Sequence, residues 1–211
     1  MLKRIGRILC VTATLLIALP AAVAESGDRV FMFVRDGSRD LDLMLREEVG
    51  VMRSMLTEAG YVVDIATSSG EPMSAEGTTL EPTVSLDDVD MENYAGMILP
   101  CMAPASGHAM PAAVESLAAQ AAELGLPIAA SRGSVTTLAN VGALRGHRYA
   151  AFAGAADREE FANGEFMGTG VVRDRTISTA GICPLASRSL GEPDGTVELT
   201  TSFIAALEDR G

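Results

Sequence analysis

Short apolar segments alternate with helical patterns along most of the chain, and this alternation limits the possible fold more than any other feature. Four such segments are rich in strand-forming residues and lie at 29–35, 61–67, 95–99 and 127–130. Strands that are apolar throughout belong to parallel sheets, whose crossover connections place helices over both faces. The sequence therefore predicts an α/β fold, a three-layer sandwich with a mostly parallel central sheet.

The remaining elements follow from spacing and from turn residues. Apolar residues at helical spacing predict helices that end near residues 59, 124, 141 and 207. Further short strands are expected at 149–152, 170–173 and 176–179, and a polar stretch at 68–91 is expected to wrap the edge of the domain. No repeat or linker divides the chain, so one domain is predicted.

The N-terminus has the three parts of a secretory signal. Three basic residues open the chain, an apolar run covers 8–18, and Pro20 interrupts it before a small-residue pattern that ends at Ala24. The run is shorter than the ~20 residues that a membrane span needs. We therefore expect a cleaved signal at 1–24, a mature domain at 25–211 without a membrane anchor, and a periplasmic or secreted protein.

Charge and composition exclude several functions. The signal holds three of the 16 basic residues and none of the 28 acidic ones, which leaves 13 basic against 28 acidic residues. Such a surface repels nucleic acid and anionic lipid. Lys3 is the only lysine and leaves with the signal, so lysine-based covalent chemistry is excluded. We expect no cofactor, because the sequence contains no phosphate loop, zinc pattern or dinucleotide fingerprint.

Ligands of open α/β sheets bind beyond the carboxyl ends of the strands. The residues that follow the predicted strands are therefore the candidates for a site, and they are Asp36, Cys101 with Met102, Ser131 with Arg132, and residues 181–183.

Four stretches resemble the ThiJ/PfpI family of the class I glutamine-amidotransferase-like superfamily. They read LTEAGYVVDIAT, VDMENYAGMILP, VGALRGHRYAAF and VVRDRTISTAG, and the likeness runs from Arg29 to the C-terminus. The resemblance implies a flavodoxin-like sandwich and a homodimer. It also implies a site made of a glutamate on the first helix and a cysteine on a strained strand-to-helix turn, the elbow.

The sequence departs from this family pattern at the elbow. Glu48 falls at the position of the family glutamate, with Glu47 as its neighbour, but the elbow holds no cysteine. An ungapped register puts Arg132 at the cysteine position, whereas matching the following glycine puts Ser131 there. The Gly-Gly pair that often serves as the family's oxyanion hole is replaced by Cys101-Met102.

Each candidate allows more than one interpretation. Ser131 lies in an A-x-S-x-G sequence and, with His108 near the pocket as a base, would act as a nucleophile; alternatively it caps a helix. Arg132 with Gly133 would bind a small carboxylate or phosphate at a helix start, or Arg132 would pair with Glu48.

The cysteines allow two interpretations as well. Cys101 would be a displaced thiol nucleophile beside Arg132, or Cys101 and Cys183 would form a disulfide after export. Acidic residues from Asp36 to Glu47 have calcium-loop spacing, but Leu41 stands where the loop needs glycine, which favours a solvated helix start.

The function predicted from these residues is binding of a small anion, or a structural role, by a domain without the family thiol. Its pocket would include Glu48, Cys101, Met102, Ser131, Arg132, Gly133, Cys183 and His108. The alternative is a hydrolase or lyase that uses Ser131 or Cys101 as nucleophile and Glu48 as the acid/base.

Overall fold

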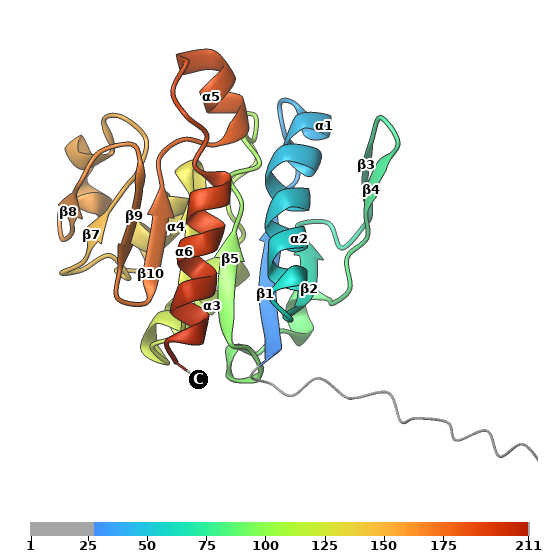
Figure 1. Ribbon diagram of the computed structural model, residues 1–211, viewed down its shortest axis with the longest axis horizontal. Helices are drawn as coiled ribbons and strands as arrows, with labels where there is room; N and C mark the ends of the chain where they lie inside the picture. The colour runs from blue at the N-terminus through green and yellow to red at the C-terminus, as the bar shows by residue number, and fades with distance from the viewer. Residues whose placement is uncertain (1–27, 211) are drawn as a thin grey trace, which may run out of the picture.

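The computed structural model describes residues 28–210, and the predicted signal lies outside this range. Its centre is a six-stranded sheet of order β2-β1-β5-β6-β10-β9 (Figure 1). The strands are β1 (Arg29–Val34), β2 (Val62–Thr67), β5 (Gly96–Leu99), β6 (Ile128–Ser131), β9 (Val171–Asp174) and β10 (Ile177–Ala180). Only β9 runs antiparallel to its neighbour. The predicted α/β sandwich with a mostly parallel sheet is confirmed.

Helices cover both faces of the sheet. On one face lie α1 (Leu41–Met44), α2 (Gly50–Glu58) and α6 (Thr196–Glu208), and on the other lie α3 (Ala112–Glu123) and α4 (Val135–Asn140) (Figure 1). The side chains of β1 divide between the two layers. Val30 and Met32 pack with the first group of helices, while Phe31 and Phe33 pack with the second. Burial on both faces explains why this strand is apolar throughout.

Smaller elements extend the two edges of the sheet. The predicted polar wrap contains a hairpin of β3 (Met73–Ala75) and β4 (Thr78–Leu80), and the pair β7 (Arg148–Tyr149) and β8 (Glu165–Phe166) lies at the opposite edge. Helix α5 (Pro184–Leu190) was not predicted, and the strand expected at 149–152 is the shorter β7, which ends at Tyr149. Both elements are short, so their hydrophobic period is too brief to detect. Short 3-10 turns are η3 (Leu86–Asp88), η4 (Met91–Asn93), η5 (Arg132–Ser134), η6 (Ala155–Asp157) and η7 (Glu159–Phe161).

The predicted first helix is interrupted by a π-helical turn, η2 (Leu45–Val49), between α1 and α2. Asp40 caps the start of α1 by accepting a hydrogen bond from the Leu43 backbone N–H, 3.1 Å away. The π turn changes the angle between successive side chains, and it leaves Glu48 buried between Leu45 and Val49. Within 28–210, no helix is long and apolar enough to cross a membrane.

Candidate functional site

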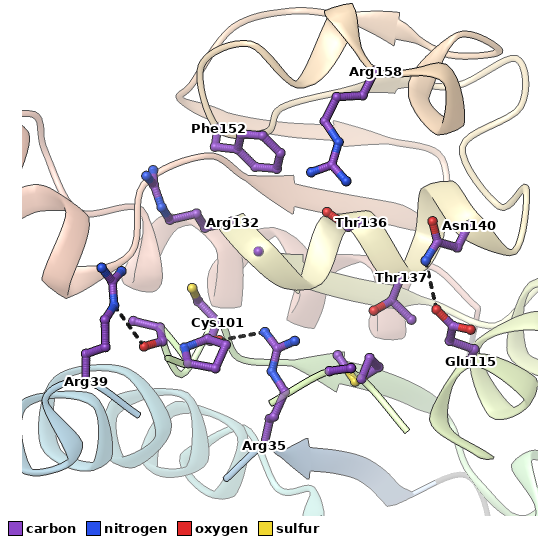
Figure 2. A pocket seen from close by; sticks show the side chains of 15 residues that line it. Arg35, Arg39, Cys101, Glu115, Arg132, Thr136, Thr137, Asn140, Phe152 and Arg158 are labelled. Atoms are coloured by element: carbon purple, nitrogen blue, oxygen red, sulfur yellow. Dashed lines mark hydrogen bonds between the residues drawn. The ribbon is translucent and has the colours of Figure 1, made fainter. Parts of the chain in front are cut away.

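Two adjoining clefts open at the carboxyl ends of the parallel strands. The first, of about 460 Å³, is lined by Arg35, Arg39, Arg132 and Arg158 among others, and we call it the arginine cleft (Figure 2). The second, of about 420 Å³, is lined by Cys101 and Cys183 among others, and we call it the thiol cleft. Arg39, Cys101, Ala103 and Arg132 line both clefts. The clefts lie where parallel α/β sheets bind their ligands.

Arg132 holds the strained position of the turn that joins β6 to α4. Its φ is +43°, in the left-handed region that non-glycine residues rarely adopt, whereas Ser131 is extended at φ −102°. The Arg132 guanidinium Nη1 donates a hydrogen bond to the Gly181 carbonyl oxygen at 2.9 Å. Of the two elbow registers that the sequence leaves open, this strain favours the one that places Arg132 at the elbow.

Glu48 is fully buried beneath this turn. Its Oε1 accepts a 2.7 Å hydrogen bond from the Ser131 hydroxyl, and its Oε2 accepts a 3.0 Å bond from the Met102 backbone N–H. Burial, with a smaller contribution from Cys101, raises the pKa of Glu48 to about 8. We call Glu48, Ser131 and Met102 the buried acid cluster; its polar groups are paired with one another.

Of the two alternatives for Arg132, its pairing with Glu48 is not observed within residues 28–210. The elbow directs Arg132 to the Gly181 carbonyl oxygen, and Glu48 accepts hydrogen bonds from Ser131 and Met102. Ser131 does not cap the helix through its side chain, since its hydroxyl donates to Glu48.

The two histidines contact other parts of the molecule. The exposed His108 ring packs against the backbone of Gly37, where a side chain would collide with it, and His147 lies 3.6 Å from Asp174. Neither residue is among those lining the two clefts, and Ser131 itself is only 1% exposed. The geometry therefore supplies Glu48, and neither histidine, as the polar partner of Ser131.

Three arginines of the cleft, Arg35, Arg39 and Arg158, were not predicted from the sequence, and Arg35 is the buried one. It directly follows β1, is only 8% exposed, and donates from Nη2 to the Cys101 carbonyl oxygen at 3.3 Å (Figure 2). Its Nε is buried and has no hydrogen-bond partner within residues 28–210. Burial lowers the pKa of Arg35 because the charged guanidinium has lost water. A charged residue ending an apolar strand was the available signal in the sequence.

The other arginines of the cleft are anchored at its rim. Arg39 Nε donates to the Ala103 carbonyl oxygen at 3.4 Å. Arg158 pairs with Glu160 and lies 5.6 Å from the centre of the Phe152 ring, a cation–π contact. Glu115, an acidic residue on the wall, accepts a 2.8 Å hydrogen bond from Asn140. The lining of the cleft is therefore strongly positive.

The structure brings Cys101 and Cys183 together as free, buried thiols. The interaction between the two thiols is the main cause that raises the pKa of Cys101 and lowers the pKa of Cys183. The predicted disulfide stays a prediction.

Of the other predicted pocket residues, Gly133 lines the arginine cleft, and Met102 is fully buried within the acid cluster. Residues 28–210 contain no group of three or more His, Cys, Asp or Glu side chains that could hold a metal ion.

Comparison with known proteins identifies the family. No curated protein matches the chain. The chain resembles a ThiJ/PfpI domain protein from Brachyspira murdochii, with 14% identity, a TM-score of 0.64, and coverage of 88% of this chain and 99% of that one. It also resembles Drosophila melanogaster DJ-1beta, with 18% identity, a TM-score of 0.56, and coverage of 86% and 97% respectively. Oxidised Toxoplasma gondii DJ-1 is 20% identical, with a TM-score of 0.57 and coverage of 85% and 97%. These likenesses show a shared fold, and because the DJ-1/PfpI family model matches residues 28–185, the chain belongs to the DJ-1/PfpI family.

Proposed function

We propose that this protein is a DJ-1/PfpI domain that binds a small anion in the arginine cleft and has lost the thiol chemistry of the elbow. The observation that carries the proposal is Arg35, a buried guanidinium whose Nε has no partner within the described residues. A buried donor without a partner costs about 1–3 kcal/mol, and more when it is charged. An anion in the cleft would remove this cost.

The surroundings of Arg35 favour the same kind of ligand. Four arginines line the cleft, although the whole chain has a net charge of −12. Guanidinium groups match carboxylate and phosphate oxygens with paired, charge-assisted hydrogen bonds. Phe152 gives the wall an apolar surface, while Thr136 and Asn140 add polar groups. A small organic carboxylate or a phosphate fits this lining.

The elbow supports a binding role over turnover. Arg132 occupies the strained turn, and a guanidinium does not act as a nucleophile. Ser131 is buried, its hydroxyl donates a hydrogen bond to Glu48, and it is not among the residues that line the two clefts.

Binding is tested by thermal unfolding of the purified protein with inorganic phosphate, succinate and citrate. At least one of these anions should raise the melting temperature, since a ligand at 100 times its Kd stabilises the folded state by about 2.7 kcal/mol. Arg35→Gln should abolish the shift. Arg53→Gln is the matched control, because Arg53 is exposed on α2 and lines neither cleft. The proposal fails if no anion shifts the transition, or if Arg35→Gln shifts as much as the control.

One observation favours the alternative enzyme. A carboxyl group whose pKa is raised to about 8 is suited to proton transfer near neutral pH, and Glu48 lies beneath the cleft. A hydrolase or lyase would use Ser131 or Cys101 as its nucleophile. Labelling of native Ser131 by a fluorophosphonate, or of Cys101 by iodoacetamide, with loss of the label in Glu48→Gln, would support this reading over simple binding.

We also propose that the domain is exported after cleavage behind Ala24 and works as a homodimer. Export rests on the basic, apolar and small-residue pattern of residues 1–24, and the homodimer rests on family resemblance. The N-terminal sequence of the protein from a cell fraction, together with its mass by light scattering, tests both. A cytosolic chain that begins at Met1 would contradict export.

A further inference from the structure

The arginine cleft contains an acidic residue that the binding of a simple anion does not use. Glu115 lies on α3 and lines the cleft, and its Oε1 accepts a 2.8 Å hydrogen bond from the Asn140 amide. None of the ion pairs among residues 28–210 includes Glu115. An uncharged amide therefore fixes the position of this carboxylate without compensating its negative charge.

The charges of the cleft are separated along η5 and α4. Gly133 lies near the start of this stretch and Asn140 at its end, and both line the cleft. A Cβ at Gly133 would be 3.7 Å from Arg35 Nη2, so the buried guanidinium lies at the Gly133 end, whereas the hydrogen bond with Asn140 places Glu115 at the other end. Figure 2 shows the same separation, with Arg132 on one side and Glu115 with Asn140 on the other. The cleft therefore has a cationic end and an anionic end.

The length of this stretch limits the length of a ligand that reaches both ends. Gly133 and Asn140 are seven positions apart in sequence. At a rise of about 1.5 Å per residue, the two ends lie roughly 10 Å apart. A hydrogen bond at each end takes up about 2.8 Å, which leaves room for a chain of about four carbons between the outer groups of the ligand. The lining also includes Phe152 and Met110, whose apolar side chains can contact methylene groups.

We propose that the ligand of the arginine cleft is a short ω-amino carboxylate, a chain with a carboxylate at one end and an ammonium group at the other. This assignment rests on the proposed function, because it names the class of anion that the cleft binds. The carboxylate accepts a hydrogen bond from Arg35 Nε, which has no partner within residues 28–210, and the ammonium group donates to Glu115.

The same arrangement rejects two related classes of ligand. A dicarboxylate of this length would bring its second carboxylate beside Glu115, and the like charges repel. An α-amino acid carries its ammonium group on the carbon next to the carboxylate, so it cannot reach both ends of the cleft. The rim arginine Arg158 is paired with Glu160, so its positive charge opposes the ammonium group only weakly.

The ligand class is tested by calorimetric titration of the full chain at neutral pH with 4-aminobutanoate, butanoate and succinate, which all have four carbons. We expect 4-aminobutanoate to bind about tenfold more tightly than either of the others, because it alone makes a charge-assisted hydrogen bond at both ends. Glu115→Gln should reduce this preference to about twofold or less, and should change the affinity for butanoate by no more than about twofold. Glu123→Gln is the matched control, since Glu123 is exposed at the end of the same helix and lines neither cleft.

The length of the ligand is tested with the series from 3-aminopropanoate to 6-aminohexanoate. The affinity should be highest at about four or five carbons. Glu115→Asp keeps the charge and shortens the side chain by one methylene group, so it should retain the preference for an ammonium group and move the optimum to a chain one carbon longer. Circular dichroism and urea unfolding establish that each variant is folded.

Three outcomes would overturn the assignment of the ligand. They are an affinity for butanoate or succinate equal to that for 4-aminobutanoate, an undiminished preference in Glu115→Gln, and an affinity that does not change with chain length. If phosphate or succinate still binds in these cases and Arg35→Gln abolishes that binding, the proposed function stands and only the ligand class is wrong. If none of the anions binds, the proposed function fails as well.

Discussion

Ser131 and Arg132 are neighbours in sequence, but their side chains enter opposite environments. Ser131 points into the buried acid cluster, where its hydroxyl, the Glu48 carboxyl and the Met102 N–H are paired. Arg132 turns outward and lines the arginine cleft, which also holds Arg35, whose Nε has no partner among residues 28–210. The first region is closed, and its polar groups are hydrogen-bonded to one another. The second region is an open cleft in which a buried donor of the described chain lacks an acceptor.

This difference indicates which region is structural and which is available to a ligand. A paired, buried network fixes the loops that it joins, and here it connects the π turn to the ends of β5 and β6. Arg35 is bonded only in part: its Nη2 donates to the Cys101 carbonyl oxygen, whereas its Nε has no partner within residues 28–210, and the cost of that donor is removed when an anion binds. Mutations in the two regions should therefore have opposite effects on the stability of the ligand-free protein.

The largest effect is expected from Glu48→Ala. The change removes the acceptor of two buried donors and leaves a cavity, so it should lower the free energy of unfolding by about 3–5 kcal/mol. Urea unfolding at neutral pH measures this loss. Glu47→Ala is the control one position away, where an exposed ion pair with Arg188 contributes about 0–1 kcal/mol. Equal losses in the two variants would show that the buried cluster has no structural role.

The second effect is a pH dependence that belongs to the closed region. The pKa of Glu48 rises from its ordinary 4.5 to about 8 in the folded chain, so the folded state holds this proton more tightly than the unfolded state does. The stability that Glu48 contributes is complete below about pH 4.5 and falls as pH rises towards 8, by at most about 1.4 kcal/mol per pH unit. Urea unfolding between pH 5 and pH 8 should show this slope, and Glu48→Gln should reduce it. A slope that persists in Glu48→Gln would assign it to other groups.

The open region should respond in the opposite direction to Arg35→Met. Replacing a buried guanidinium with an apolar chain of similar length should leave the ligand-free protein as stable as before, or more stable by about 1 kcal/mol, because relief of the buried charge outweighs the loss of the 3.3 Å hydrogen bond to the Cys101 carbonyl oxygen. The same variant should lose its stabilisation by anions. Urea unfolding with and without citrate measures both quantities, with Arg53→Met as the control. A loss of several kcal/mol without ligand would place Arg35 in the structural region instead.

The smallest effect is expected at the rim. Arg158 is already paired with Glu160 and contacts Phe152, so its charge is partly compensated. Arg158→Gln should weaken anion binding by up to about fivefold, which corresponds to at most about 1 kcal/mol. It should leave the urea midpoint almost unchanged. Calorimetric titration compares it with Arg35→Gln, and a greater loss at Arg158 would move the centre of the binding site to the rim.

The sequence by itself determined the layers and the edge of the sheet that carries the clefts. Alternation of apolar strands with helical patterns is a local property, and it predicts a parallel sheet whose carboxyl ends lie together. For the same reason it selected Cys101, Ser131, Arg132 and Cys183 as candidates, whereas Glu48 was selected by the family resemblance. The structure connects Glu48 to Ser131 by a hydrogen bond at that edge. The side-chain partners did not follow from the alternation.

Those partners were decided by the tertiary structure. A π turn buries Glu48, and a left-handed φ turns Arg132 away from it, so the ion pair that was one of two alternatives is replaced by contacts with Ser131 and Gly181. The contacts of Arg35 with Cys101, and of Ser131 with Glu48, join residues 66 and 83 positions apart. Local periodicity contains no information about pairs at such separations, because their direction depends on backbone torsions and on the packing of the whole sheet.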